Sequence, residues 1–555
     1  MRLIRACFFI LISFGFQLIF YLYFYSFLCI WTKFTLEFNK HDQLQNKSDF
    51  IYKQSRPGKF PAASTIGLYY GTQLRRIQQN TTSIFTKSII ALMVKLLEHK
   101  CTKGQIRLMI TLLFNLMTLC LPSASLFSQS ALGKQLELPD FHHRQSEQQS
   151  IWVNSLPTST RLNWRFKTNG QVVSSPILYK GILYVGSNDG HLYALNGKTG
   201  RLNWKFKTGG AVSSSPATDG KYVYFGSMDG YYYALDLQGK IVWKFATAGE
   251  KRIGAKGYGG MQPDSMYMED LWDYFLSSPI VQKIKDTTYV FFGSSDANLY
   301  CVNAVTGQLK WHYKTKGPIH TTPVIANGVL YFGGWDTYLY ALNVNTGQLL
   351  WQFKTGDKPF MRGIQSSPVV SNGMVYFGAR DAHVYALNAQ NGHLIWAHPT
   401  ANSWVLTTVA VGDSLVFAGT SDTYLLLALD KDTGEEKWHF KSRGYVYSSP
   451  VIAGEQVVFG DYTGNLYVVD IRSNGKKFIK YPTPSRQNSA GTILNMDTLD
   501  FKFAANGADL YLYKTNQKVM ESFDQLGGIV CSVLLHNRKV YFGANDGYIY
   551  SVELK

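Results

Sequence analysis

Residues 172–206 read VVSSPILYKGILYVGSNDGHLYALNGKTGRLNWKF, and this stretch decides the fold. It contains four short runs rich in β-branched and aromatic residues, a composition typical of β-strands. Asp189 and Gly190 separate the second and third runs and predict a tight hairpin, because glycine adopts a positive φ at no steric cost. Gly200 marks another turn, before a fourth run that contains Trp204. The pattern therefore predicts four antiparallel strands in one short unit.

The same pattern recurs along the chain. Residues 212–245, 319–353 and 364–396 repeat it, and each fourth run again carries a Trp. Two weaker units follow, a degenerate one at 491–513 and a last one that ends at Lys555 without a Trp strand. A unit of this kind is one blade of a β-propeller, which buries its two faces only against neighbouring blades. Nine units are counted, the first seven with Ser-Ser-Pro-like starts at Pro176, Pro216, Pro279, Pro323, Pro368, Val409 and Pro450.

An additional Trp strand, RLNWRF at residues 161–166, stands before the first unit. If it completes the C-terminal blade, the ring closes and no sheet edge is left free. We therefore predict an all-β fold, a single closed propeller of four-stranded antiparallel blades over residues 159–555. The recurrent tryptophans are predicted to pack between blades and not to bind a ligand: Trp164, Trp204, Trp243, Trp311, Trp351, Trp396 and Trp438.

Two hydrophobic segments precede the repeats. Residues 7–31 contain no charge and are long enough to span a bilayer, so a transmembrane or signal-anchor helix is predicted within 1–31. Residues 105–131 combine a basic lead, an apolar stretch and small residues, which is the layout of a secretory signal peptide. Residues 32–104 are assigned to no domain, and the Gln- and Ser-rich residues 132–158 are predicted to form a linker.

Three interpretations of these segments remain open. The true start codon lies further downstream, so that the residues before the second segment are an artefact of the gene model. Alternatively, the two segments form a helical hairpin in the membrane, or only the first segment spans it. All three place the repeats in the periplasm or another extracytoplasmic compartment, anchored to the membrane or secreted.

Charge and cysteine content narrow the function classes. The formal net charge is +18, but more than half of the excess lies in the first 150 residues, and the repeats contain no Lys/Arg run of the kind that binds nucleic acid. We therefore predict no nucleic-acid partner. The six cysteines form no Cys-x-x-Cys motif and no adjacent pair, which argues against a zinc site, a c-type haem and a disulfide framework: Cys7, Cys29, Cys101, Cys120, Cys301 and Cys531.

The turn before the Trp strand carries a resemblance to a known family. It reads ALNGKTGRLNW at 194–204, ALNVNTGQLLW at 341–351 and ALDKDTGEEKW at 428–438. These segments resemble the repeat of the pyrroloquinoline-quinone (PQQ)-binding-like propellers, whose motif is close to A-x-D-x-x-T-G-x-x-x-W. The resemblance implies a propeller of usually eight blades, from which a count of nine departs. The family includes quinoprotein dehydrogenases and BamB-like scaffolds of outer-membrane protein assembly, so the fold alone does not select a function.

The dehydrogenase members of this family imply PQQ on a Ca²⁺ ion, a carboxylate base and a disulfide between adjacent cysteines. This chain lacks the adjacent cysteines, and Asp189, Asp229 and Asp546 occupy hairpin turns, where turn chemistry explains them. We therefore predict no catalytic residue, no metal ligand and no cofactor, PQQ with Ca²⁺ being the one cofactor considered. The histidines of the repeats stand in separate units and give no reason to expect a shared site, as with His191, His320 and His383.

One connection between blades carries an insertion, GEKRIGAKGYGGMQPDSMYMEDLWDYFL at residues 249–276. Insertions on one face of a propeller are often binding loops, and adaptable methionines with aromatic and basic residues suit contact with a partner. The alternative is a packed lid that plugs the central channel. The candidate partner- or ligand-binding residues are Arg252, Lys256, Met261, Met266, Trp272 and Tyr274.

The sequence thus favours a monomeric propeller that binds a protein partner in the cell envelope, as BamB-like scaffolds do, and that meets the membrane through its N-terminal hydrophobic segment. It favours a binding protein over an enzyme. Two alternatives remain open: a PQQ-dependent, quinoprotein-type oxidoreductase, and a carbohydrate-binding or sensor module.

Overall fold

The computed structural model describes residues 156–256, 265, 267–273, 276–358, 361–496, 502 and 513–555, all within one compact unit, Lys134–Lys555. The hydrophobic segments and linker expected in the first 155 residues lie outside the described residues. Among the helices that are described, none is both long and apolar enough to cross a bilayer.

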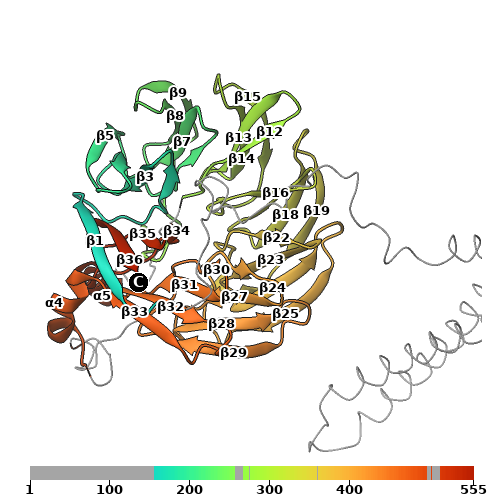
Figure 1. Ribbon diagram of the computed structural model, residues 1–555. Helices are drawn as coiled ribbons and strands as arrows, with labels where there is room; N and C mark the ends of the chain where they lie inside the picture. The colour runs from blue at the N-terminus through green and yellow to red at the C-terminus, as the bar shows by residue number, and fades with distance from the viewer. Residues whose placement is uncertain are drawn as a thin grey trace, which may run out of the picture. The chain divides into compact units, whose positions relative to one another are not determined.

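The described residues form eight four-stranded antiparallel sheets, each a propeller blade (Figure 1). The first four blades contain β2 (Ile177–Tyr179), β3 (Ile182–Ser187), β4 (His191–Asn196) and β5 (Leu202–Lys207); β6 (Ala217–Thr218), β7 (Tyr222–Ser227), β8 (Tyr231–Asp236) and β9 (Ile241–Ala246); β12 (Ile280–Ile284), β13 (Thr287–Gly293), β14 (Asn298–Asn303) and β15 (Leu309–Lys314); β16 (Val324–Ala326), β17 (Val329–Gly333), β18 (Tyr338–Asn343) and β19 (Leu349–Lys354).

The other four blades follow the same order. They contain β22 (Val369–Ser371), β23 (Met374–Ala379), β24 (His383–Asn388) and β25 (Leu394–Pro399); β26 (Ala410–Val411), β27 (Leu415–Gly419), β28 (Leu425–Asp430) and β29 (Glu436–Lys441); β30 (Val451–Ala453), β31 (Gln456–Gly460), β32 (Asn465–Asp470) and β33 (Phe478–Pro482); β34 (Leu534–His536), β35 (Lys539–Gly543), β36 (Tyr548–Leu554) and β1 (Thr160–Lys167).

The ring has eight blades, so the count of nine units was wrong. The described ends of the supposed unit at 491–513 belong to helices α4 (Pro484–Ile493) and α5 (Tyr513–Leu526) between β33 and β34, and the described residues form no ninth four-stranded sheet. Two further two-stranded sheets, also outside the blades, are β10 (Gly254–Lys256) with β11 (Tyr267–Glu269) and β20 (Asp357–Lys358) with β21 (Met361–Arg362).

The first and last strands of the propeller close the ring, as the sequence predicted. Strand β1 pairs antiparallel with β36 from Thr160 opposite Leu554 to Lys167 opposite Tyr548. In Figure 1 the cyan β1 accordingly lies beside the red β36. The last blade is therefore completed by a strand nearly 400 residues away in the sequence, a pairing that leaves the final blade no open edge at β36.

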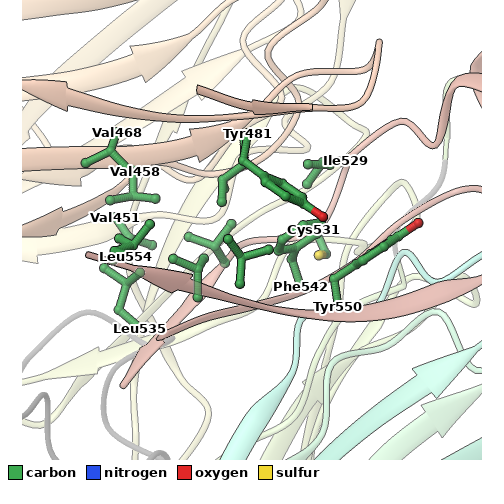
Figure 2. Close-up of a cluster of buried hydrophobic side chains, with 14 of the residues drawn as sticks. Val451, Val458, Val468, Tyr481, Ile529, Cys531, Leu535, Phe542, Tyr550 and Leu554 are labelled. Carbon is green, nitrogen blue, oxygen red and sulfur yellow. The ribbon is translucent and has the colours of Figure 1, made fainter. Parts of the chain in front are cut away.

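Eight hydrophobic clusters join the eight blades, one between each pair of neighbours. Figure 2 shows the cluster between blades 7 and 8, where Val458 and Val468 face Phe542 and Tyr550. A single blade cannot bury the apolar side chains on its two faces, but neighbouring blades can. This burial contributes to the stability of the fold about 25 cal/mol for each Å² of apolar surface removed from water. The core of this protein is thus divided among the contacts between blades.

Seven of the eight outer strands, all but β33, carry a Trp that lies on a glycine turn of the next blade. A Cβ built on that glycine would lie 2.5–2.9 Å from the indole, so a hydrogen atom is required there. In five cases the indole nitrogen also donates to a backbone carbonyl of the next blade, at 2.9–3.1 Å. The pairs are Trp164–Gly200, Trp204–Gly239, Trp243–Gly307, Trp311–Gly347, Trp351–Gly392, Trp396–Gly434 and Trp438–Gly475.

A matched pair of glycine substitutions separates this docking from backbone strain. A Cβ built on Gly392 (φ 72°) would lie 2.5 Å from the Trp351 ring. A Cβ built on Gly373 (φ 76°) would meet no atom within 4 Å. We expect Gly373→Ala to cost about 1 kcal/mol from the positive φ alone. Gly392→Ala should cost about 3 kcal/mol, because the indole must also move. Urea unfolding of the two variants measures the difference, and equal losses would show that the docking contributes nothing.

The recurrent aspartates of the second hairpins are used structurally. In six blades such an aspartate accepts a hydrogen bond of 2.5–2.7 Å from the Tyr hydroxyl of the next strand. In five of them it also accepts a backbone N–H from a neighbouring connection, as Asp189 does from Asn169 at 2.9 Å. These carboxylates join hairpins to connections between blades, which agrees with the turn chemistry inferred from the sequence.

Candidate functional site

The insertion 249–276 joins β9 to β12 and lies on one face of the propeller. Antiparallel strands alternate in direction, so this face also holds the second hairpin of every blade and the other connections between blades; we call it the insertion face. Of the predicted binding residues, the structure describes the side chains of Arg252 and Trp272 only. The side chain of Lys256 lies outside the described part of the chain, as do Met261, Met266 and Tyr274.

Three buried carboxylates attach the insertion to the blades. Glu250 accepts hydrogen bonds from the Ser294 hydroxyl at 2.6 Å and from the Ser295 backbone N–H at 2.9 Å, both in blade 3. Asp270 pairs with Arg380 of blade 5 at 2.6 Å, and both side chains are almost fully buried. The insertion is therefore held in one position by charged contacts and is not a loose loop at these residues.

The third carboxylate, Asp273, is 1% exposed. It accepts hydrogen bonds from the Ile253 backbone N–H at 2.7 Å and from the Gln365 amide at 3.1 Å. One of its oxygens also lies 2.9 Å from Nδ1 of His320, which comes from the start of blade 4. Asp273 thus connects the insertion with blades 4 and 5.

Both ring nitrogens of His320 are engaged. Nε2 lies 2.9 Å from the Ser295 hydroxyl, which in turn lies 2.9 Å from the Lys251 carbonyl and donates to it. Since that hydroxyl has one hydrogen to give, Nε2 must donate to it. The indole Nε1 of Trp335 lies 3.1 Å from Nδ1 of His320, but the Asp273 oxygen is closer and can only accept. We therefore infer that Nδ1 carries a proton and donates it in a hydrogen bond to Asp273.

Burial lowers the pKa of His320, and the Asp273 carboxylate outweighs burial, so the pKa of His320 lies above its usual value of 6.5. The order Asp273–His320–Ser295 is that of a hydrolase triad. Here the serine hydroxyl is 5% exposed and is bonded to both backbone groups of Lys251, at 3.1 and 2.9 Å. The arrangement fits a structural attachment, not a nucleophile.

Trp272 of the insertion enters an aromatic cluster at the middle of this face. Its ring centroid lies 5.4 Å from Tyr445, 6.1 Å from Tyr447, 6.3 Å from Tyr462 and 6.3 Å from Phe523 of α5. We call these five residues the plug. They belong to a hydrophobic cluster that also contains residues from blades 1, 6 and 8, as it would at the ring centre: Val173, Leu406 and Val530.

A cavity of about 290 Å³ lies against the insertion on this face. Its walls come from the hairpins and connections of blades 1 and 2, from the insertion and from His320. The lining residues are Asn188, Ala211, Ser213, Met228, Lys251, Arg252, Glu269, Asp273, Leu276 and His320.

Sequence reasoning found the insertion by its length but missed the residues that fix it. Asp273 and His320 are 47 residues apart in sequence, and Asp270 and Arg380 are 110 apart. The insertion also contains acidic residues, among them Glu250, Asp270 and Asp273. These residues were a signal in the sequence that could have suggested contacts with the blades. Their partners in other blades carried no pattern of their own.

Eight four-stranded blades, with Trp–Gly docking at seven of their eight junctions, define a PQQ-repeat β-propeller. The chain belongs to the family whose sequence model is described as "Beta-alanine-activating enzyme, beta-propeller", which matches residues 266–554, just over half of the chain. A second model, "Outer membrane protein assembly factor BamB", matches residues 155–259. Among curated proteins, none matches this chain.

Solved structures share the fold at low sequence identity. The crystal structure of BamB from Moraxella catarrhalis has a TM-score of 0.51 at 14% identity and covers 72% of this chain and 98% of its own. Quinohemoprotein alcohol dehydrogenase from Comamonas testosteroni has a TM-score of 0.52 at 14% identity and covers 74% of this chain and 79% of its own. At these identities the likeness concerns the fold.

The described residues do not fit a quinone bound through Ca²⁺. In the part of the chain that the structure covers, no three His, Cys, Asp or Glu side chains are grouped so that they could hold a metal. The plug packs aromatic side chains against residues of blades 1, 6 and 8 on the insertion face. Cys301 and Cys531 are buried in separate blades, and burial raises the pKa of each thiol to about 12. No catalytic step through PQQ is derived.

Proposed function

We propose that this propeller is a protein-binding scaffold of the cell envelope and that the insertion face is its binding surface. One observation carries the proposal. The insertion is held by three buried carboxylates, so its described residues next to those contacts, Lys251 to Gly254 and Tyr267 to Glu269, are presented on a fixed base. Rigid presentation reduces the entropy that binding would otherwise cost.

The outward residues of the insertion suit a partner. Tyr267 on β11 is 52% exposed, and Lys251 and Glu269 beside it are exposed as well. Exposed tyrosine is enriched at the centres of protein interfaces. Among the candidate contacts proposed from the sequence, Arg252 lies in the same described part of the insertion. Trp272 contributes by anchoring the insertion in the plug.

The relatives support this assignment by analogy. BamB is named an outer-membrane protein assembly factor, and its solved structure matches this propeller over 98% of its length. An extracytoplasmic location and a monomeric propeller fit the same analogy and the hydrophobic segments before the repeats. A quinoprotein-type oxidoreductase is the second candidate, since a quinohemoprotein dehydrogenase shares the fold.

Paired photo-crosslinking tests the binding surface. A photoreactive amino acid is placed in the full chain at Tyr267, on the insertion face, or at Val305, in a turn of the opposite face; the two residues are 52% and 50% exposed. We expect a discrete crosslinked protein from position 267 in cells, and none from position 305. Equal crosslinking at both positions, or crosslinking at 305 alone, would overturn the assignment of the face.

A further inference from the structure

The outer strands of five consecutive blades begin with exposed apolar side chains. Twelve large apolar side chains are exposed among the described residues, and eight of them occupy the first or second position of β5, β9, β15, β19 or β25. Each of the eight is 40–51% exposed. We call them the apolar belt: the pairs Ile241 with Val242, Leu349 with Leu350 and Leu394 with Ile395, and the single residues Leu202 and Leu309.

The fold does not require apolar residues at these positions. In blade 6 the same two positions, on β29, hold Glu436 and Lys437, and both are exposed. The outer strand is held instead by the Trp that follows, which docks on the next blade in blade 6 as in the others. The apolar belt is therefore apolar surface that the ring leaves in water, as surfaces that bind something else often are.

The apolar belt lies at one level around the ring. Each of its members follows the turn between the third and the outer strand of a blade, and this turn lies on the face opposite the insertion face. Because the blades are repeats arranged about the ring axis, residues at one strand position lie near one plane. Figure 1 shows β9, β15, β19 and β25 along the outside of the ring. The belt thus offers an extended rim and not a pocket.

Basic residues accompany the apolar belt. The turns and outer strands of blades 1 to 5 contain nine Lys or Arg and no Asp or Glu, over residues 197–207, 237–246, 304–314, 344–354 and 389–399. Asp219 and Asp236, which lie on the same face, accept backbone N–H groups of their own turns at 2.8–3.0 Å. The belt ends at blade 6, where the matching segment holds Asp432, Glu435 and Glu436. Apolar side chains and positive charge therefore share the same rim.

The chain enters the propeller on this face. Thr160, the first residue of β1, pairs with Leu554 at the end of β36, the third strand of blade 8. The third strands end at the same face as the apolar belt. Upstream of Thr160 the sequence contains the hydrophobic segment for which a transmembrane or signal-anchor helix is predicted within 1–31. A membrane anchor joined at this point favours contact through the face that carries the belt.

We propose that the apolar belt and its basic residues contact an anionic lipid surface, with the insertion face turned away from it. Exposed Leu, Ile and Val side chains enter the boundary between headgroups and acyl chains, while lysines attract lipid phosphates. A second copy of this chain is a poorer occupant, because it would bring two basic rims together. The inference concerns the face opposite the insertion and does not depend on which molecule binds the insertion face.

Photo-crosslinking of the full chain in lipid vesicles tests the contact. A photoreactive amino acid replaces Leu350 of the belt, Lys437 at the matched position in blade 6, or Tyr267 on the insertion face, and mass spectrometry measures the lipid adducts. In vesicles of phosphatidylglycerol and phosphatidylcholine we expect about tenfold more adduct at position 350 than at 437 or 267. Vesicles of phosphatidylcholine alone should give clearly less adduct at 350, because the lysines then lack anionic partners.

A charge variant separates the lysines from the apolar side chains. Lys205, Lys244 and Lys310 are exposed on β5, β9 and β15, so replacing all three by Gln should leave the near-ultraviolet circular dichroism unchanged. The same variant should lower the adduct at 350 in anionic vesicles to the level seen with phosphatidylcholine alone. Three results would overturn the lipid contact: equal adducts at all three positions, no dependence on vesicle charge, or a crosslinked protein in place of lipid from position 350 in cells. None of them bears on the protein that position 267 is expected to capture.

Discussion

Replacing Trp164 by Ala is expected to destabilise the propeller by about 2–4 kcal/mol. The indole is half-buried, which places the loss somewhat below that of a fully buried tryptophan. It lies on Gly200 of blade 1 and donates to the Gly197 carbonyl at 3.1 Å. Because Trp164 stands on β1, the strand that completes blade 8, its loss also weakens the junction that closes the ring.

Arg161→Ala is the matched control on the same strand. Arg161 pairs with Glu553 at 2.7 Å, but its side chain is 62% exposed, and exposed ion pairs contribute little. Chemical denaturation followed by near-ultraviolet circular dichroism should show a lower midpoint for Trp164→Ala and an unchanged midpoint for Arg161→Ala. Identical midpoints for both variants would mean that ring closure does not limit stability.

Arg380→Met is expected to have an effect of similar or greater size on the docking of the insertion. The variant leaves the Asp270 carboxylate buried without its partner at 2.6 Å. Breaking a buried pair from one side costs about 3–5 kcal/mol, because a charge remains uncompensated in a poorly polar site. The Arg380 guanidinium also stacks 3.8 Å from the Trp404 ring centroid and 4.8 Å from that of Trp335, and those contacts are lost as well.

The double variant Asp270→Leu with Arg380→Met serves as the control. It removes both charges, so the desolvation cost disappears together with the attraction, and most of the docking should return. Limited proteolysis within the insertion measures this: rapid cleavage in Arg380→Met and slow cleavage in the double variant. If the double variant is cleaved as rapidly as Arg380→Met, then the loss of the ion pair, and not the uncompensated charge of Asp270, explains the weaker docking of the insertion.

The sequence predicted most of the ring because its signals are local. Asp189 and Gly190 form their hairpin within one blade, and Trp204 and Gly200 lie at a fixed spacing in each repeat. The pairing of β1 with β36 was also predictable, since an unmatched Trp strand at one end corresponded to a missing one at the other.

The degenerate unit at 491–513 was predicted wrongly for a physical reason. Short apolar runs do not distinguish a strand from a helix segment without a clear period. Residues 484–493 and 513–526 are helical in the structure and belong to no blade, and the second of these helices brings Phe523 into the plug. The expected number of blades in the family was the better guide.

The candidate site was predictable only in outline. The insertion was visible as extra length in one connection, but its docking contacts join blades that are far apart in sequence. His320 looked like one of several unrelated histidines, although it meets Asp273 at 2.9 Å. Such contacts form because the closed ring brings blades 2 to 5 around one insertion. No sequence motif predicts them.

A titration of the purified full chain with PQQ in the presence of Ca²⁺ tests the central claim most directly, with Trp fluorescence and thermal unfolding as readouts. The plug packs aromatic side chains against residues of blades 1, 6 and 8, and the described residues include no metal-binding group of three His, Cys, Asp or Glu side chains. We therefore expect neither saturable quenching nor a rise in Tm. A saturable, Ca²⁺-dependent rise in Tm would contradict the scaffold and establish a quinoprotein instead.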